Sequence, residues 1–299
     1  MKQNIMKHKI ELPKIDELNF PLIYKHLGNF IKSEVLQAGV NRVVLGLSGG
    51  IDSAASCFLA ASALGKDNVT ALIMPYESSS KSSMDDALKV INTLGIKYYV
   101  LDISEQINKY FNNENNETEG RGNALATGGD IALKLRKGNK MARERMSILY
   151  DYSYKLNSLV LGTSNKSELL LGYGTLYGDM ASALNPIGDI YKTQIYQLAE
   201  HLGIPKTIIN KPPSADLWEG QSDESELGFT YKTADDIMYL LIDKMYKPEV
   251  VISLGFEENT VNKIYERIKK SQYKRRMPLI AKVSERTINI DFRYLRDWA

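Results

Sequence analysis

Cysteine and histidine are scarce in this chain of 299 residues, which has one cysteine and three histidines. A single cysteine excludes an internal disulfide bond and a zinc site built from several cysteines, and it fits a reducing compartment. The histidines His8, His26 and His201 lie outside every motif described below, so no Ser/His or Cys/His catalytic pair is indicated. Cys57 lies in an alanine-rich stretch, where we expect it to be a small core residue.

Long apolar runs and a strong net charge are also lacking. No apolar run reaches the roughly 18 residues that a membrane-spanning helix needs, so none is predicted. The start MKQNIMKHKI has no apolar core, so we expect no signal peptide and a cytoplasmic protein. The formal net charge of +2 is too small to indicate nucleic acid binding, but it leaves room for a basic pocket that holds a small polyanion.

Strand and helix patterns alternate along the first two thirds of the chain. Apolar runs predict strands at 42–47, 69–75, 97–103 and 158–163. Helical spacing predicts helices at 18–39, 52–65, 81–95, 140–157, 193–203, 233–246 and 257–272. Apolar strands that alternate with helices predict an α/β fold, with a doubly wound, mostly parallel sheet and helices on both faces.

Two polar segments interrupt this pattern. The asparagine-rich stretch 112–130 predicts a loop, and the stretch 211–229, with its two prolines and acidic residues, predicts a long structureless lid. In the lid, Trp218 is either a hydrophobic latch or a packing residue. No repeat or second-domain boundary is evident. We therefore expect one domain over 1–299, with an N-terminal helical arm at about 14–39, a core at about 40–210, and the lid and C-terminal helices at about 211–299.

The stretch VVLGLSGGIDSA, residues 43–54, joins a predicted strand to a predicted helix through a glycine-rich turn. Such turns bind phosphates, because backbone N–H groups and a helix N-terminus point at the anion. A Walker loop would need a lysine, and a dinucleotide fingerprint would need glycine in place of Ser48, so both fail. Asp52 stands where a phosphate loop would favour a cation. One explanation is a plain turn in which Asp52 caps the helix.

The other explanation is that this loop resembles the S-G-G-x-D-S loop of the ATP pyrophosphatase superfamily. The resemblance implies that the loop holds the β,γ-pyrophosphate as it leaves the α-phosphate of ATP. Ser48, Gly49, Gly50 and Ser53 would supply hydrogen-bond donors. Asp52 would face the phosphates through Mg²⁺, a hard cation that carboxylates and substrate phosphates commonly share.

Motifs farther along the chain narrow the resemblance. They are ARERM (142–146), LGTSNKSELLLGYGTLYGD (161–179), NPIGDIYKTQIYQLAEHLGIP (185–205), KPPSADLWEGQSDESELG (211–228) and YKRR (273–276). In this order they resemble the NAD synthetase family from the first predicted helix almost to the C-terminus. The resemblance implies a Rossmann-like, adenine nucleotide alpha-hydrolase-like fold. It also implies an activity: ATP-dependent amidation of deamido-NAD with ammonia, giving NAD, AMP and pyrophosphate through an adenylated intermediate.

Residues that match the family's motifs take on expected roles. ATP is expected to contact Gly46, Leu47, Ser48, Gly49, Gly50, Ile51, Asp52, Ser53, Thr163, Lys192 and Ser214. Mg²⁺ is expected on Asp52 and Glu168, and deamido-NAD is expected at Arg143, Leu176, Tyr273 and Lys274. Catalysis is expected from Asp52, Lys192 and Asp179, the last of which receives and orients ammonia.

Several of these residues also have ordinary interpretations. Glu168 could be a surface glutamate beside Lys166, and Arg143 and Arg145 could both be solvated helix charges. Lys192 could simply begin a helix. The YKRR cluster could provide cations that stabilise a helix C-terminus.

Two positions depart from the pattern of many ammonia-using relatives: Leu176 stands where they have lysine, and Ala183 where they have aspartate. The form TLYGD resembles the synthetase portion of glutamine-dependent enzymes. About 40 residues precede the loop strand and none is a cysteine, so no glutaminase domain fits there and free ammonia is the expected nitrogen source. A separate glutaminase partner stays open.

The family resemblance also implies a homodimer with deamido-NAD at the interface, to which the first helix and the helix at 140–157 would contribute. The alternatives to this function are another ATP pyrophosphatase amidotransferase and a nucleotide-binding homologue that has lost catalysis.

Overall fold

Four parallel strands form the sheet at the centre of the molecule, in the order β3–β2–β1–β4. The strands are β1 (Val43–Gly46), β2 (Val69–Ile73), β3 (Lys97–Val100) and β4 (Leu159–Val160). A parallel bridge between Leu161 and Leu184 continues the pairing beyond β4. The structure is a computed structural model that describes residues 14–15, 18–114, 130–214, 216–218 and 220–291. Its sheet confirms the predicted fold class.

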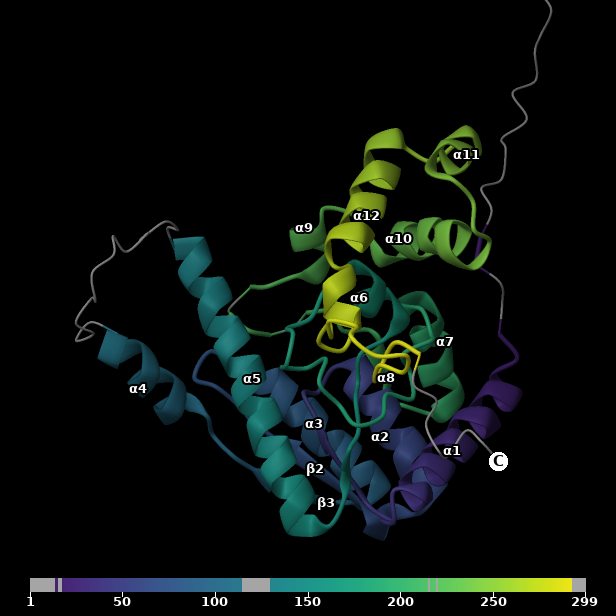
Figure 1. Cartoon of the computed structure of the whole chain (residues 1–299). Coiled ribbons are helices and arrows are strands. Elements are labelled where there is room, and N and C mark those ends of the chain that lie inside the picture. Colours follow the sequence, from purple (N-terminus) through teal and green to yellow (C-terminus); the bar gives the residue numbers. More distant parts are fainter. Residues whose placement is uncertain (1–13, 16–17, 115–129, 215, 219, 292–299) are drawn as a thin grey trace, which may run out of the picture.

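Helices cover both faces of this sheet (Figure 1). Side chains alternate along β1, so Val43 and Leu45 enter the core on one face while Val44 enters the core on the other. The first face packs against α1 (Phe20–Gln37), α2 (Ile51–Leu64), α3 (Lys81–Leu94), α7 (Lys192–Leu202) and α8 (Lys206–Ile209). The second face packs against α4 (Ser104–Glu114) and α5 (Asp130–Leu156). A short turn, η1 (Lys66–Asn68), leads into β2.

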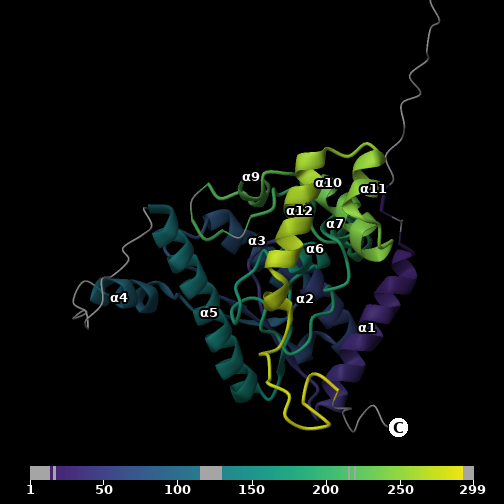
Figure 2. The same ribbon diagram turned by 45° about the horizontal axis from the view of Figure 1, so that its top comes forward.

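A third core lies among helices that follow β4, most of which stand at the top in Figures 1 and 2. They are α6 (Lys166–Leu171), α9 (Asp223–Leu227), α10 (Tyr231–Met238), the π-helical turn η2 (Tyr239–Asp243), α11 (Pro248–Ser253), α12 (Glu258–Lys270) and η3 (Gln272–Arg275). We call this group the C-terminal layer. Helix α6 follows β4 directly, so this layer adjoins the end of the sheet where β4 ends.

The elements differ from the sequence predictions in several places, of which those nearest the site are the following. Helix α5 begins at Asp130 rather than 140, and α4 was not predicted at all. Strands β3 and β4 are shorter than expected. The predicted lid contains α9, so it is not structureless, because Leu227 packs in the C-terminal layer and Asp223 is buried beside it. Residues 115–129 of the predicted loop lie outside the described residues.

Cys57 is fully buried in α2, as predicted, and burial raises the pKa of its thiol to about 12. A thiol with such a pKa stays protonated near neutral pH and is a poor nucleophile. Within the described ranges, no helix is both long and apolar enough to cross a membrane.

The order of the strands defines where a ligand would bind. From β1 the chain proceeds to β2 and β3 on one side of the sheet, and then returns to add β4 on the other side of β1. The loops after β1 and β4 therefore diverge at the carboxyl ends of these neighbouring strands. Open α/β sheets bind ligands at such a point.

Candidate active site

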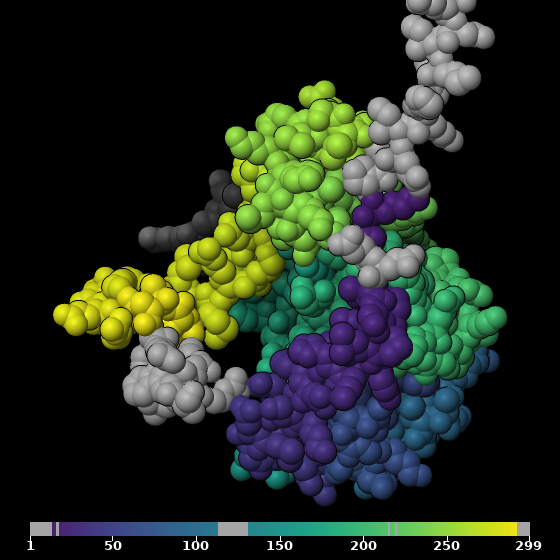
Figure 3. Space-filling view, turned by 90° about the vertical axis from the view of Figure 1, so that its right-hand side faces the viewer, coloured from purple at the N-terminus to yellow at the C-terminus, as the bar shows by residue number. Residues whose placement is uncertain are grey.

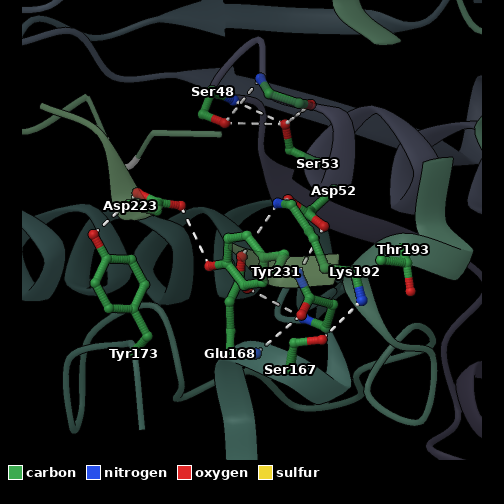
Figure 4. A network of polar contacts seen from close by, with 12 residues as sticks. Ser48, Asp52, Ser53, Ser167, Glu168, Tyr173, Lys192, Thr193, Asp223 and Tyr231 are labelled. Carbon is green, nitrogen blue, oxygen red and sulfur yellow. Dashed lines mark hydrogen bonds and ion pairs between the residues drawn. The ribbon is translucent and has the colours of Figure 1, made fainter. Parts of the chain in front are cut away.

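The loop after β1 is closed by its own serines (Figure 4). The backbone N–H of Ser48 donates to Ser53 Oγ at 3.3 Å, and Ser53 Oγ donates to the Gly50 carbonyl at 3.0 Å. The backbone N–H of Gly50 donates to Ser48 Oγ at 3.3 Å. These bonds fix the loop where α2 begins, and the N–H groups of the first turn of a helix have no partner inside the helix.

Gly49 allows the loop to approach α3. Its φ is +80°, a left-handed conformation that side chains rarely adopt. A Cβ atom on this residue would lie far inside contact distance of the Ser83 carbonyl oxygen. Two independent constraints therefore require glycine here.

Asp52, Glu168 and Lys192 meet at the carboxyl ends of β1 and β4. The Lys192 ammonium pairs with Asp52 Oδ2 and lies 3.5 Å from Glu168 Oε1. Asn165 Nδ2 donates to Asp52 Oδ1 at 2.9 Å, and the Lys192 ammonium lies 5.4 Å from the centre of the Tyr231 ring. Helices α2, α6 and α7 each supply one charged group, so residues far apart in sequence form one cluster (Figure 4).

This cluster excludes the interpretation of Asp52 as a helix cap. The N-cap of α2 is Gly50, which receives no side-chain cap, and the Asp52 carboxylate is engaged by Asn165 and Lys192 instead. The interpretation of Glu168 as a surface glutamate beside Lys166 is also wrong. Glu168 points to Lys192, while Lys166 pairs with Asp189 and Asp243.

The electrostatics of the cluster follow from burial and proximity. Burial, and secondly the charge of Asp52, raise the pKa of Glu168 to about 8. Burial alone would lower the pKa of Lys192, but Asp52 and Glu168 raise it above its ordinary value. The ammonium therefore stays charged between the two acidic side chains.

The cluster has the donor chemistry that a magnesium site needs. Mg²⁺ commonly takes one or two carboxylates and completes its coordination with water and substrate phosphates. Asp52 and Glu168 are two such carboxylates beside the glycine-rich loop after β1, so the residues fit this ion. Across the described part of the chain, no group of three or more His, Cys, Asp or Glu residues could hold a metal.

A cleft of about 690 Å³ extends from this cluster. One wall is apolar and contains Leu72, Met74, Met146 and Leu149, whereas the loop after β1 and the charged cluster form another. Its size and its mixture of apolar and convergent polar groups are typical of ligand sites.

The lid segment borders the cleft. Ser78 Oγ donates to the Leu217 carbonyl at 3.3 Å, and the Ser80 N–H donates to Asp216 Oδ2 at 3.2 Å. Trp218 lines the cleft, and a Cβ on Gly138 of α5 would lie 3.7 Å from its ring. The described lid residues thus connect α5 to the segment that follows β2.

Asp179 also lines the cleft. Its Oδ1 accepts a bond of 2.9 Å from the Thr175 N–H. Protein atoms around the cleft restrict hydration of this carboxyl group, and this desolvation raises its pKa; the Thr175 N–H and Lys274 act in the other direction. Lys274 Nζ donates to the carbonyls of Gly172 and Gly174 at 2.8 and 2.7 Å.

The two arginines of α5 differ in their surroundings. Arg145 is half-buried, lines the cleft and donates from Nε to the Met74 carbonyl at 2.9 Å. It is therefore not a solvated helix charge. Arg143 is exposed and donates to the Leu176 carbonyl at 3.1 Å.

Most of the predicted site residues lie together. The predicted residues that line the cleft are Gly46, Leu47, Ser48, Gly50, Asp52, Ser53, Thr163, Glu168, Asp179, Lys192, Ser214 and Lys274. Gly49 instead contacts α3, and the Ile51 side chain is buried in the core. Arg143, Leu176 and Tyr273 are not part of the cleft wall of the single chain, and Tyr273 is 60% exposed.

Sequence reasoning did not single out Asn165 or the tyrosines around Asp223. The Tyr173 hydroxyl donates to Asp223 Oδ1 at 3.0 Å and to Glu226 Oε2 at 3.0 Å, and the Tyr231 hydroxyl donates to Asp223 Oδ2 at 3.4 Å. The bonds of Asn165 and Tyr173 cross 113 and 50 positions, so local patterns contain no signal for them. Tyr231 is only eight positions from Asp223, but none of the motifs includes it. This network ties α9 to the charged cluster.

The sequence model of the NAD synthase family matches residues 23–278. The NH(3)-dependent NAD(+) synthetase of Trichlorobacter lovleyi is 50% identical over 281 residues, which cover 94% of this chain and 97% of the relative.

Two solved structures have the same fold as this chain. The NH3-dependent NAD synthetase from Campylobacter jejuni has a TM-score of 0.70 and 35% identity, covering 89% of this chain and 100% of that one. The NMN synthetase from Francisella tularensis has a TM-score of 0.75 and 30% identity, covering 89% and 99%.

Proposed function

The chain belongs to the NAD synthase family, and we infer from this membership that its cleft makes NAD from deamido-NAD, ammonia and ATP. The observation that carries the inference within the structure is the cluster of Asp52, Glu168 and Lys192 beside the closed loop after β1. These groups suit a reaction that cleaves ATP between its α- and β-phosphates.

The first step activates a carboxylate. An oxygen of the nicotinate carboxylate attacks the α-phosphorus, a new oxygen–phosphorus bond forms, and the bond to pyrophosphate breaks. The N–H groups of the loop and of the first turn of α2 would bind the departing pyrophosphate. Lys192 would neutralise charge that develops on the phosphates, because its buried ammonium is already fixed at this point.

We assign Mg²⁺ to Asp52 and Glu168. When bound there, the ion would offset the negative charge of the phosphates. The two carboxylates stand within reach of the same ammonium, and burial raises the pKa of Glu168, so a divalent cation at this point would also stabilise the ionised carboxylates.

The second step forms the amide. Ammonia attacks the activated carbonyl carbon, the bond to AMP breaks, and one proton leaves the nitrogen. We assign Asp179 to receive and orient ammonia, since its carboxyl group lines the cleft and is held by the Thr175 N–H. The lid would keep water from the adenylate while it waits for ammonia.

The substrate side of the site extends beyond the cleft of one chain. Arg143 donates to the Leu176 carbonyl, and burial lowers the pKa of Lys274, to which the nearby charge of Arg143 makes a smaller contribution. Tyr273 precedes Lys274 and is exposed. We therefore place deamido-NAD at Arg143, Leu176, Tyr273 and Lys274, at a surface that a second copy of the chain would complete.

Exposed apolar side chains favour an interface on α5 and β3. All four residues of β3 are exposed, among them Tyr98, Tyr99 and Val100, and on α5 the Tyr154 side chain is 94% exposed. Large apolar patches on a soluble protein commonly mark contact surfaces. Figure 3 shows that the last described segment (yellow) projects from the body, with Leu279 at 85% exposure.

We predict a homodimer that Tyr154→Lys dissociates. A lysine at this exposed position is harmless in a monomer but places a charge in the proposed interface. Sedimentation equilibrium should give a dimer for the wild type and a monomer for Tyr154→Lys. Leu22→Lys on α1 is the matched variant at an exposed position of the other candidate helix. If Leu22→Lys dissociates the dimer and Tyr154→Lys does not, the interface lies on α1, and a monomeric wild type would refute the dimer.

One assay tests the function. ATP, Mg²⁺ and ammonium, with deamido-NAD present, should give equal amounts of NAD and AMP, whereas omitting deamido-NAD or adding a chelator should stop both. Glutamine in place of ammonium should give little NAD, because the relatives use ammonia by name. Nicotinate mononucleotide is included as a second substrate, since one structural relative is named an NMN synthetase.

The outcomes separate the alternatives. AMP formation that depends on the mononucleotide but not on deamido-NAD would indicate a different amidotransferase. No AMP under any condition would indicate a homologue that has lost catalysis.

A further inference from the structure

Asp235 on α10 is a fully buried carboxylate outside the cleft. It belongs to the C-terminal layer, and none of the sequence motifs singled it out. A buried ionisable group is costly unless its oxygens are hydrogen-bonded. Its partners therefore indicate why it is there.

Each oxygen of Asp235 serves a different helix. Oδ1 accepts a bond of 2.5 Å from Ser167 Oγ on α6. Oδ2 accepts bonds of 2.8 Å from both the N–H and the Oγ1 of Thr193 on α7. Ser167 in turn accepts a bond of 2.8 Å from the Lys192 N–H. One carboxylate thus clamps the beginnings of α6 and α7 together.

The clamped residues are the immediate neighbours of the charged cluster. Ser167 precedes Glu168, and Thr193 follows Lys192 (Figure 4). Glu168 and Lys192 themselves lie 3.5 Å apart across this junction. A change in the spacing of the two helices would therefore move a metal ligand relative to the lysine that faces the phosphates.

Asp235 has the chemistry of a rigid clamp. The Thr193 N–H is one of the first donors of α7, which have no partner inside the helix. Bonds from neutral donors to an ionised acceptor are stronger than those between neutral groups. Burial raises the pKa of Asp235 to about 6, and the donors Ser167 and Thr193 counteract this shift, so the carboxylate is ionised at neutral pH.

We propose that Asp235 is a positioning residue that fixes Glu168 and Lys192 at the spacing the adenylation step requires. This inference rests on the proposed function, because it assigns Asp235 a role through two groups of that site. Residues that support metal ligands from behind commonly change activity by 10- to 100-fold when altered.

Asp235→Asn tests the proposal. The amide keeps one oxygen for Thr193, but its NH₂ group faces Ser167 and cannot accept the bond from the Ser167 hydroxyl. We expect kcat to fall roughly 10- to 100-fold per folded molecule, with a smaller change in KM for deamido-NAD. The apparent Mg²⁺ concentration for half-maximal rate should rise. Folded protein is quantified by circular dichroism and a thermal melt.

Asp236→Asn is the matched control. Asp236 is the next residue on α10, is half-buried and accepts a bond of 3.0 Å from the Ile15 N–H, which an asparagine oxygen can replace. This variant should keep the kcat of the wild type.

Ser167→Ala provides a second test if Asp235→Asn does not fold. It removes the Oδ1 bond and the acceptor of the Lys192 N–H, and it should also lower kcat per folded molecule. The proposal is overturned if Asp235→Asn, or Ser167→Ala in its place, lowers stability but keeps wild-type kcat and Mg²⁺ dependence. A wild type that forms no NAD would instead refute the proposed function. That result differs from a failure of the Asp235 proposal, in which the wild type is active and the variants keep its kcat.

Discussion

Replacing Asp52 with asparagine should lower NAD formation at least roughly 1,000-fold while the chain stays folded. Asparagine has nearly the same shape, but its one oxygen can accept from only Asn165 or Lys192, and its NH₂ group meets the other donor. What it loses is the charge that a hard cation needs, because Mg²⁺ binds a carboxylate oxygen far better than an amide oxygen. Without that charge, pyrophosphate would leave from a site whose cation is poorly held.

The measurement is NAD and AMP formation at saturating ATP and deamido-NAD, over a range of Mg²⁺ concentrations. Asp67→Asn is the control, since Asp67 is exposed in η1, at the far end of α2 from the loop. It should match the wild type. Asp52→Asn with undiminished turnover would remove the metal bridge as the reason for a carboxylate in the phosphate loop.

Sequence patterns predict the central strands β1 and β2 well, because these strands are short apolar runs that pack on both faces. Val43, Val44 and Leu45 are all buried, and no alternation is needed to recognise such a strand. The loop at 46–53 is equally predictable from the sequence, because its glycines, its serines and Asp52 form one contiguous motif. Its closure by Ser48 and Ser53 follows from that local sequence.

Other elements could not be read from local patterns. The first ten residues of α5 expose Ile131, Leu133 and Leu135, so their apolar positions do not describe a buried stripe. Helix α9 lies in a stretch rich in acidic residues and glycine, and it is held by Leu227 in the C-terminal layer. Tertiary packing explains α9, whereas the start of α5 has no buried apolar stripe from which to recognise it.

The charged cluster shows the same limit. Asp52 and Lys192 are 140 positions apart, and only the family resemblance placed them in one site before the structure did. Asp235 bonds to Ser167 and Thr193, which are 68 and 42 positions away, and none of the sequence motifs includes Asp235. A local pattern predicts which residues have reactive side chains. The packing of the first turns of α2, α6 and α7 determines how those side chains are positioned.

Gly49→Ala is the second change for which we expect a large effect. The new methyl group would collide with the Ser83 backbone carbonyl, which cannot move without shifting the first turn of α3. The loop would have to withdraw, and the N–H groups that we propose bind the phosphates would move with it. Misplacing such groups by about 1 Å can reduce a rate 100-fold, so kcat/KM for ATP should fall by roughly that factor or more.

Gly65→Ala separates this collision from backbone strain alone. Gly65 ends α2 with φ of +82°, nearly the same as the +80° of Gly49, but a Cβ atom there would meet nothing within 4 Å. Its alanine variant should lose about 1–2 kcal/mol of stability and keep wild-type kcat/KM for ATP. Equal kinetic losses in both variants would mean that the left-handed backbone, and not the close approach to Ser83, explains glycine at position 49. A loss confined to Gly49→Ala would establish that the phosphate loop works only while it rests against α3.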